Sequence, residues 1–227
     1  MESILPPYKD FIELEWETLK LLHDYLSQWA ALSHSAGFVA QCWNYKNLPR
    51  FQFSTYWNID YRDKECRVFL GADVRKQDGS ERVADMTYFI CIVEGTDKPT
   101  KVLRKFHFDY VTARADRRKP HPRFHLQYCG GLPPPMESLG ITKELMIPLL
   151  PDVEEPRIFF MPVTLGLVMN IAFYEFPTKD TDEIKKRGEW QNLIRKNEKV
   201  ILKPFYKKCA DLAGRDNVVF FEQVYVQ

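Results

Sequence analysis

The sequence lacks the short motifs that mark several large enzyme classes. It contains no GxxxxGK[ST] phosphate loop, no strand-linked GxGxxG, no GxSxG turn and no nuclease-type carboxylate pair followed by a lysine. Each of these motifs holds a phosphate, a cofactor or a nucleophile in a defined local geometry. Their absence argues against nucleotide-dependent motors, dinucleotide dehydrogenases and serine hydrolases of the usual kind.

Cysteine pairs and long uninterrupted apolar runs are also missing. The five cysteines are widely spaced and form no CxxC, which is typical of reduced thiols in a cytosolic protein and does not indicate a zinc ribbon. The most apolar stretch, 158–176, is interrupted by Pro162, Thr164 and Asn170, so it predicts a buried helix rather than a membrane span. The N-terminus has no apolar run after a basic start, so no signal peptide is expected. These features predict a cytoplasmic protein without membrane contact.

Charge gives no global binding signal, because 32 basic residues nearly balance 31 acidic ones. Binding to nucleic acid would therefore need a local basic patch. Hydrophobic residues make up 45% of the chain and charged residues 28%, which is ordinary for a folded globular protein. The length suits one domain, so residues 1–227 are predicted to form a single domain.

Hydrophobic periodicity predicts both helices and strands. Apolar residues at steps of three and four predict an amphipathic helix over about 9–35. Further helices are expected from Pro162 to about Phe176, and from a capping box of Asp180 and Glu183 to Gly214 with a kink at Pro204. Period-two alternation predicts strands in 51–60, 65–76, 83–95, two parts of 101–131, and 217–226.

Short turns join most of the predicted strands, which favours antiparallel neighbours because parallel neighbours need long crossovers. The sequence therefore predicts an α+β fold: a five- or six-stranded, mainly antiparallel meander sheet with the N-terminal helix and two C-terminal helices on one face. The proline-rich connection 132–162 is long for a loop, and such connections often carry or cover a functional region.

Residues that can carry chemistry gather in the stretch 101–131, which is predicted to be two strands joined by a basic loop. Matching faces in an antiparallel register would place Asp109 opposite Arg123 or His121, and His107 opposite His125 or Arg123. Such a set can supply a general acid and base, with an arginine stabilising a developing anion, as ribonuclease-like phosphodiester chemistry needs. The alternative is an exposed sheet face with cross-strand ion pairs. The candidate catalytic residues are His107, Asp109, His121, Arg123 and His125.

The loop at the tip of these two strands is basic. An arm of this shape can grip phosphates, although a solvated hairpin end has the same composition. The candidate nucleic-acid contacts are Arg114, Arg117, Arg118 and Lys119.

A metal site is a weaker hypothesis for the same region. His121 and His125 form an HxxxH spacing, but on a strand their side chains would be about 13 Å apart. This distance is too long for one ion, so no metal ligand and no cofactor is predicted.

Two resemblances add to these patterns. The motifs FHFDY and HPRFHLQYCGG, followed by PRIFFMPVTLGLVMNIAFYEF, resemble a family of uncharacterised bacterial proteins with a His-bearing strand pair and a later Pro-Arg-Ile segment. This resemblance implies a bacterial cytosolic origin and a toxin or phage-defence neighbourhood. Arg157 lies in the Pro-Arg-Ile segment and could approach the strand pair or cap the following helix.

The order of His121-Pro122, Cys129 and a Pro162-led apolar helix resembles the ubiquitin-conjugating fold. That resemblance implies a thioester on Cys129. The chain departs from the fold's pattern, because position 123 is Arg instead of Asn, the Tyr-Pro-x-x-Pro-Pro passage is missing and the connection from Cys129 to the helix is too long.

These observations favour a nucleic-acid-associated bacterial protein that uses the polar face of 101–131. The alternative from a different class is a non-enzymatic interaction module that binds a protein partner within a multi-protein system. The sequence does not specify a substrate or an oligomeric state.

Overall fold

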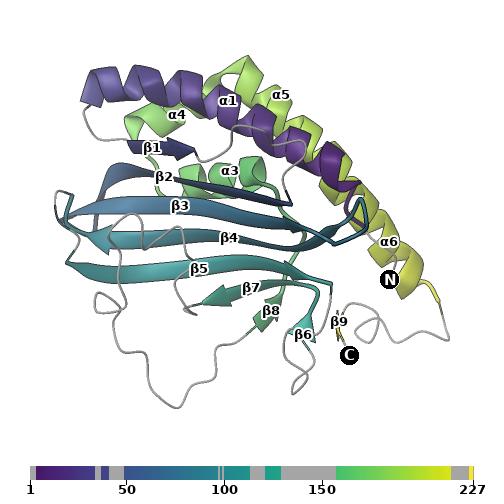
Figure 1. The fold of residues 1–227 in the computed structure, drawn as a ribbon. Coiled ribbons are helices and arrows are strands. Elements are labelled where there is room, and N and C mark those ends of the chain that lie inside the picture. Colours follow the sequence, from purple (N-terminus) through teal and green to yellow (C-terminus); the bar gives the residue numbers. More distant parts are fainter. Residues whose placement is uncertain are drawn as a thin grey trace, which may run out of the picture.

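The computed structural model describes residues 4–33, 37–40, 49–96, 98, 100–112, 121–128, 157–215 and 225–226. An antiparallel sheet forms the centre of this part of the chain, and its strands follow one another in chain order (Figure 1). This arrangement confirms the predicted α+β meander. The seven strands are β1 (Gly37–Ala40), β2 (Arg50–Tyr61), β3 (Lys64–Lys76), β4 (Val83–Glu94), β5 (Lys101–Val111), β7 (Phe124–Tyr128) and β8 (Arg157–Phe159). The short strands β1 and β8 bring the number above the predicted five or six.

Tight turns set this topology. Arg62 and Asp63 join β2 to β3 and have φ angles of 51° and 61°, as a two-residue hairpin loop requires. Gly79, with a φ of 66°, lies in the turn between β3 and β4. Both connections are too short for a crossover, so each strand must pair antiparallel with its predecessor.

Alternation gives the sheet two different faces. The helix face carries most of the large buried core, including Phe51, Trp57, Leu70 and Tyr88. The second face has a smaller apolar cluster made of Phe69, Phe89, Cys91, Val93 and Val102. It also holds buried polar residues, which are Ser54, Lys105, His107, His125 and Gln127.

The described helices lie on the helix face (Figure 1). Helix α3 is apolar around most of its circumference and lies between α1 and the sheet, where it contacts β3 and β4. A helix of this composition needs cover on all sides. None of the described helices is both long and apolar enough to span a membrane. The helical elements are α1 (Tyr8–Ser33), α3 (Leu165–Glu175), α4 (Lys179–Lys186), α5 (Gly188–Asn197), the π-helical η2 (Glu198–Leu202) and α6 (Lys203–Ala213).

Several predicted helix boundaries were wrong in detail. Helix α3 begins after the N-cap Thr164 rather than at Pro162, because the Thr164 hydroxyl accepts the Leu167 N–H. The capping box before α4 consists of Thr178 and Thr181, so the predicted Asp180–Glu183 box is not formed.

The last predicted helix is also divided. Arg187 has an extended backbone and separates α4 from α5. The predicted kink at Pro204 takes the form of the π-helical segment η2. Strand β9 (Tyr225–Val226) pairs with β6 (His121–Pro122) in a separate two-stranded sheet, so the described end of the last predicted strand does not join the main sheet.

Candidate functional site

The second face brings three of the predicted site residues together on β5 and β7. Asp109 lies opposite His125, with Thr87 of β4 on its other side. His107 lies opposite Gln127. The predicted parity was right, because odd residues meet odd residues, but the predicted pairs were displaced by two residues. Alternation determines which face a residue occupies and leaves such even shifts undetermined.

Asp109 connects β4 to β7 through its carboxylate. The Thr87 hydroxyl donates to Asp109 Oδ1 at 2.7 Å, and His125 Nε2 lies 3.6 Å from Asp109 Oδ2. The second distance is too long for a hydrogen bond, and it becomes that of an ion pair when His125 Nε2 is protonated. His125 Nδ1 lies 2.9 Å from the Pro122 carbonyl oxygen, which can only accept, so Nδ1 carries a proton. Nε2 is therefore the nitrogen through which His125 exchanges a proton beside Asp109.

His107 is held in its neutral form. Its pKa falls from 6.5 to about 3, first because burial disfavours the charged imidazole and then because Lys105 and His125 add positive charge nearby. Only 8% of the residue is exposed. Its Nε2 has no hydrogen-bond partner in the part of the chain that the structure describes. A neutral imidazole with an unpaired nitrogen is able to donate to or accept from a ligand.

Arg123, two residues before His125 in sequence, has a second unpaired hydrogen-bond donor. Its Nε is buried and lacks a hydrogen-bond partner among the described residues. The Arg123 carbonyl accepts the Val111 N–H at 3.0 Å, which places Arg123 at the end of the β5–β7 ladder, two residues before His125. Buried polar atoms are usually hydrogen-bonded, so an unpaired one needs a specific reason. Trp57 Nε1 also lacks such a bond in the described part of the chain, whereas the Tyr25 and Tyr88 hydroxyls have Arg187 and Glu15 as partners.

The remaining predicted residues are not part of this group in the described structure. The backbone of His121 belongs to β6, which pairs with β9 outside the main sheet. Arg157 of β8 pairs with Gln127, and its side chain lies outside the described part. The predicted nucleic-acid contacts Arg114, Arg117, Arg118 and Lys119, and the predicted thioester residue Cys129, also lie outside the described residues.

The rest of the second face matches the alternative prediction of cross-strand ion pairs. Arg50 donates two hydrogen bonds to Asp73, and Arg75 donates to Asp85 at 2.6 Å. Both arginines are exposed, at 42% and 57% of their side-chain surface. The ionisable side chains of this face therefore form a solvated part, made of these two ion pairs of β2 to β4, and a buried part on β5 and β7.

A second buried ionisable group, which the sequence analysis missed, lies on the helix face. Glu15 of α1 is fully buried, and both of its oxygens accept from the Leu165 N–H, at 3.0 and 3.2 Å. Burial raises its pKa from 4.5 to about 8, against the opposing effect of the Leu165 hydrogen bond and of Tyr88. The signal was available, because Glu15 lies four residues after Phe11 and four before Leu19 in a buried stripe.

Other buried polar side chains complete the surroundings of Glu15. Thr164 donates to Asn197 Oδ1 at 2.7 Å, and Asn197 Nδ2 donates to the Leu193 carbonyl at 2.8 Å. The first bond ties the start of α3 to the end of α5, and the second, within α5, holds the Asn197 amide in place. Glu15, Thr164 and Asn197 each have a hydrogen-bond partner. We therefore assign them a structural role, which is to position α3.

The described residues offer no metal site, since no three His, Cys, Asp or Glu side chains among them gather closely enough to hold an ion. Cys91 lies opposite Lys105 on the second face, and burial raises the pKa of its thiol to about 12. A thiol of this kind is protonated at neutral pH and is a poor nucleophile. The chemistry available to the second face is therefore that of imidazole, carboxylate and guanidinium groups.

Comparison of the chain with protein-family models, with curated proteins and with solved structures finds no match. The two resemblances drawn from sequence motifs stay predictions, and the functional argument rests on the site itself.

Proposed function

We propose that Asp109 and His125 form an acid–base site that cleaves phosphodiester bonds in RNA. One observation carries the proposal: the Asp109–His125 contact at 3.6 Å shares its face with the unpaired Nε2 of neutral His107. Acid–base catalysis usually relies on neighbouring titratable groups whose pKa values are moved apart by their different surroundings. The unpaired Arg123 Nε adds a cationic donor two residues before His125 in sequence.

The proposed reaction uses one imidazole to move one proton. His125 Nε2 takes the proton of a ribose 2′-hydroxyl while Asp109 stabilises the resulting imidazolium. O2′ then forms a bond to phosphorus as the bond from phosphorus to O5′ breaks, and the same proton passes from His125 to O5′. The products are a 2′,3′-cyclic phosphate and a 5′-hydroxyl end. Arg123 stabilises the phosphoryl charge, and neutral His107 forms a hydrogen bond to the sugar.

Burial restricts what reaches this pair. His125 is 4% exposed, so the residues around it have to move before a nucleotide reaches Nε2. A water-poor site also strengthens the interaction of Arg123 and Asp109 with charges that develop during the reaction. The proposal therefore favours single-stranded RNA, in which a single nucleotide is able to leave its neighbours.

Cleavage of a labelled single-stranded RNA tests the proposal. His125→Ala is expected to lower the rate by about 10²–10⁴-fold, since it removes the group that moves the proton. Asp109→Asn is expected to lower the rate less, because the imidazole remains. The products of the wild type should carry a 2′,3′-cyclic phosphate, and a DNA of the same sequence should stay intact.

Arg75→Ala is the matched control. It removes a cation from the same face, but its partner Asp85 lies in the solvated part. The control should keep the wild-type rate. The proposal fails if the wild type leaves RNA uncut at low salt, or if His125→Ala cleaves as fast as the wild type.

A non-enzymatic interaction module is the second candidate function. The observation in its favour is that Tyr128 of β7 and Ile158 of β8 are exposed, at 41% and 49%. Strand β8 is the last in the described sheet, and exposed apolar residues near a strand edge favour pairing with another chain. If this is the function, Ile158→Asp should abolish self-association in sedimentation velocity. An unchanged monomer–dimer distribution would contradict it.

A further inference from the structure

A basic segment occupies the C-terminal helices, and it is separate in sequence from the predicted basic loop of 101–131. Between positions 195 and 215 the chain has seven basic and only two acidic residues. The whole protein carries a net charge of +1, so this segment is a local concentration of positive charge. The basic residues are Arg195, Lys196, Lys199, Lys203, Lys207, Lys208 and Arg215.

Three of these lysines are exposed and form no ion pair within the described part of the chain. Lys199, Lys203 and Lys207 are exposed, and none forms an ion pair with a residue that the structure describes. Lys196 differs, because it donates to Glu17 at 2.7 Å. The charge of the three lysines is therefore available to an external anion.

The three lysines lie on one side of the helix. Asn197, Ile201 and Phe205 are buried and follow one another at steps of four. Each lysine comes two residues after one of them, which is about 200° around a helix. The lysines are therefore opposite the side that packs on the protein. We call Lys199, Lys203 and Lys207 the basic ridge.

The π-helical segment η2 is the reason for this alignment. Pro204 has no N–H and crowds the preceding turn, and η2 comes directly before it, with the Lys203 N–H bonded to the Glu198 carbonyl. In a regular α-helix the eight steps from Lys199 to Lys207 would turn the last lysine of the ridge about 80° away from the first. One π turn accommodates an extra residue and reduces this angle to about 20°.

An exposed aromatic ring accompanies the ridge. Tyr206 is 55% exposed and lies between Lys203 and Lys207 in sequence. Its hydroxyl contacts Met161 Sδ at 3.5 Å, and its ring meets Phe205 at a centroid distance of 5.4 Å. The ring is thus held in place while much of its surface remains free to stack on a base.

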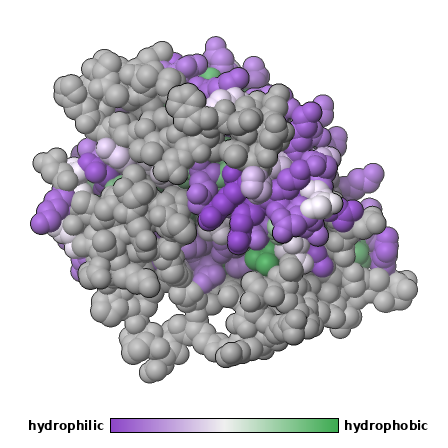
Figure 2. All heavy atoms as spheres, viewed as in Figure 1, coloured by the Kyte–Doolittle hydropathy of each residue, from purple (hydrophilic) through white to green (hydrophobic). Residues whose placement is uncertain are grey.

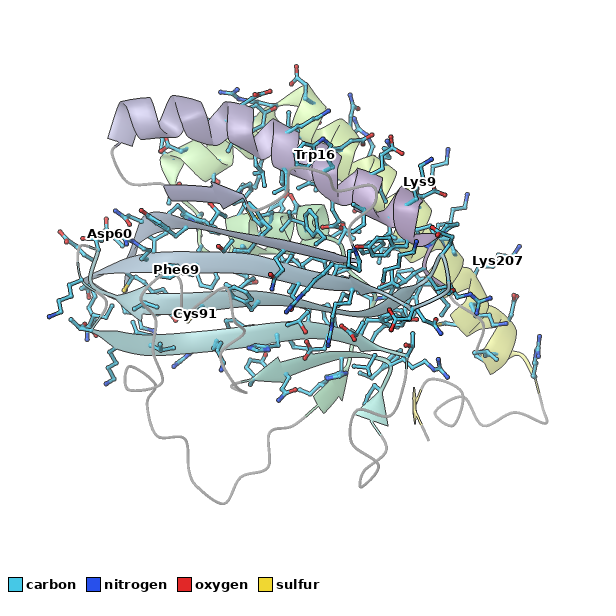
Figure 3. All side chains as sticks on the ribbon, in the orientation of Figure 1. Lys9, Trp16, Asp60, Phe69, Cys91 and Lys207 are labelled. Atoms are coloured by element: carbon cyan, nitrogen blue, oxygen red, sulfur yellow. The ribbon has the colours of Figure 1, made fainter. Side chains whose placement is uncertain are left out.

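The surface around α6 is exposed and mainly hydrophilic. Figure 3 shows Lys207 on α6 pointing away from the body of the molecule. Figure 2 shows a mainly hydrophilic surface on the right, where Figure 1 has α6.

We propose that the basic ridge and Tyr206 form a docking surface for the backbone and bases of single-stranded nucleic acid. Exposed lysines at steps of about 6 Å along the helix meet several phosphates of one strand. A lipid surface fits less well, because an interfacial helix needs an exposed apolar face and α6 buries Phe205 and Leu212. An acidic protein also fits less well, because it would pair with the lysines but has no bases to stack on the exposed Tyr206 ring.

Helix α6 packs on the helix face beside β7, and the second face lies on the other side of that strand. Phe205 meets Phe124 of β7 at a centroid distance of 5.9 Å, and Phe124 directly precedes His125. The choice of RNA as the probe rests on the proposed function, whereas binding itself does not require cleavage.

Fluorescence anisotropy of a labelled 20-nucleotide single-stranded RNA tests the ridge. The triple variant Lys199→Gln, Lys203→Gln, Lys207→Gln should weaken binding at least tenfold at 50 mM salt. The slope of log affinity against log salt should fall by about 2, since each phosphate contact on a single strand contributes about 0.7. Tyr206→Ser should weaken binding, and Tyr206→Phe should restore it because the ring is kept.

The matched control is Lys98→Gln, Lys101→Gln, Lys179→Gln, which removes the same charge from exposed lysines that form no ion pair with a described residue. It should bind RNA as the wild type does. All six lysines are exposed, so both variants should keep the wild-type melting temperature. His125→Ala separates the two proposals, because it should lose cleavage and retain full binding.

Three outcomes overturn the ridge proposal. One is equal weakening by the ridge variant and the control variant, and another is no RNA binding by the wild type at 50 mM salt. The third is tighter binding to phosphatidylserine vesicles or to polyglutamate than to RNA, since that result assigns the ridge to a different partner.

Discussion

Glu15 on the helix face and His107 on the second face are both buried and strongly perturbed ionisable groups, and they differ in what surrounds them. On the helix face, both oxygens of Glu15 accept a hydrogen bond from the Leu165 N–H. On the second face, His107 Nε2 has no hydrogen-bond partner in the described chain. Burial is the largest cause of both pKa shifts, so the contrast lies in the partners and not in the exposure.

The difference separates a structural role from a binding role. A buried polar group with its partners in place holds neighbouring elements in one arrangement, as Glu15 does for α1 and α3. A buried group without a partner keeps its hydrogen-bonding capacity for something that arrives later. His107 and Arg123 are of this second kind, which is why the proposed chemistry is assigned to the second face.

The largest expected effect is the pH dependence due to Glu15. Its pKa is about 8 in the folded state and 4.5 when exposed, so the folded protein keeps a proton that the unfolded chain releases. The wild-type free energy of unfolding should therefore fall by about 5 kcal/mol, relative to Glu15→Gln, as the pH rises from 4.5 to 8. Urea unfolding of both proteins across this range measures the difference. Parallel curves would contradict the assignment of a protonated Glu15.

His107 should give a slope of the opposite sign at lower pH. Its folded pKa of about 3 lies below 6.5, so its contribution is complete above pH 6.5 and is lost as the pH falls toward 3. Relative to His107→Phe, the wild type should lose about 5 kcal/mol between pH 6.5 and 3. Acid unfolding followed by circular dichroism tests this. If His107→Phe shows the same acid sensitivity as the wild type, His107 is not the buried neutral group.

Gly71→Ala should disturb the second face by a smaller amount. A methyl group there would lie 2.2 Å from Phe89 Cζ and 2.8 Å from the Phe53 carbonyl oxygen. The ring and the backbone cannot both move away, so we expect a destabilisation of about 1–3 kcal/mol. Gly188→Ala is the control, because a methyl group there meets nothing within 4 Å. Melting temperatures that are equal for Gly71→Ala and the wild type would show that the packing around Phe89 is loose.

The smallest effect is expected in the solvated part of the second face. Arg75→Ala removes an ion pair with Asp85 in which the arginine is 57% exposed. Exposed pairs of this kind change stability by less than about 1 kcal/mol. Urea unfolding at low and high salt should show almost no difference from the wild type. A loss of several kcal/mol would mean that the solvated and buried parts form one coupled network.

The sequence allowed much of the candidate site to be predicted, because alternation is a local property. His107, Asp109 and His125 share a face in the structure, as their odd spacing predicted. Their partners across the ladder were displaced by two residues, because alternation is satisfied equally by every even shift.

Burial was harder to predict. The neutral state of His107 depends on its low exposure and on the charges of Lys105 and His125, and neither follows from the position of His107 in its own strand. Glu15 was missed because a carboxylate in a helix is normally exposed, and its burial depends on α3 packing over it.

By itself, the sequence determined the helices and strands and the residues that share a face, since hydrophobic period and turn chemistry act over a few residues. Only the tertiary structure decided which groups meet across long distances. Glu15 reaches Leu165 across 150 residues, and the Asp109–His125 pair depends on the register of β5 against β7. These contacts arise from packing between whole elements, and no local pattern specifies such packing.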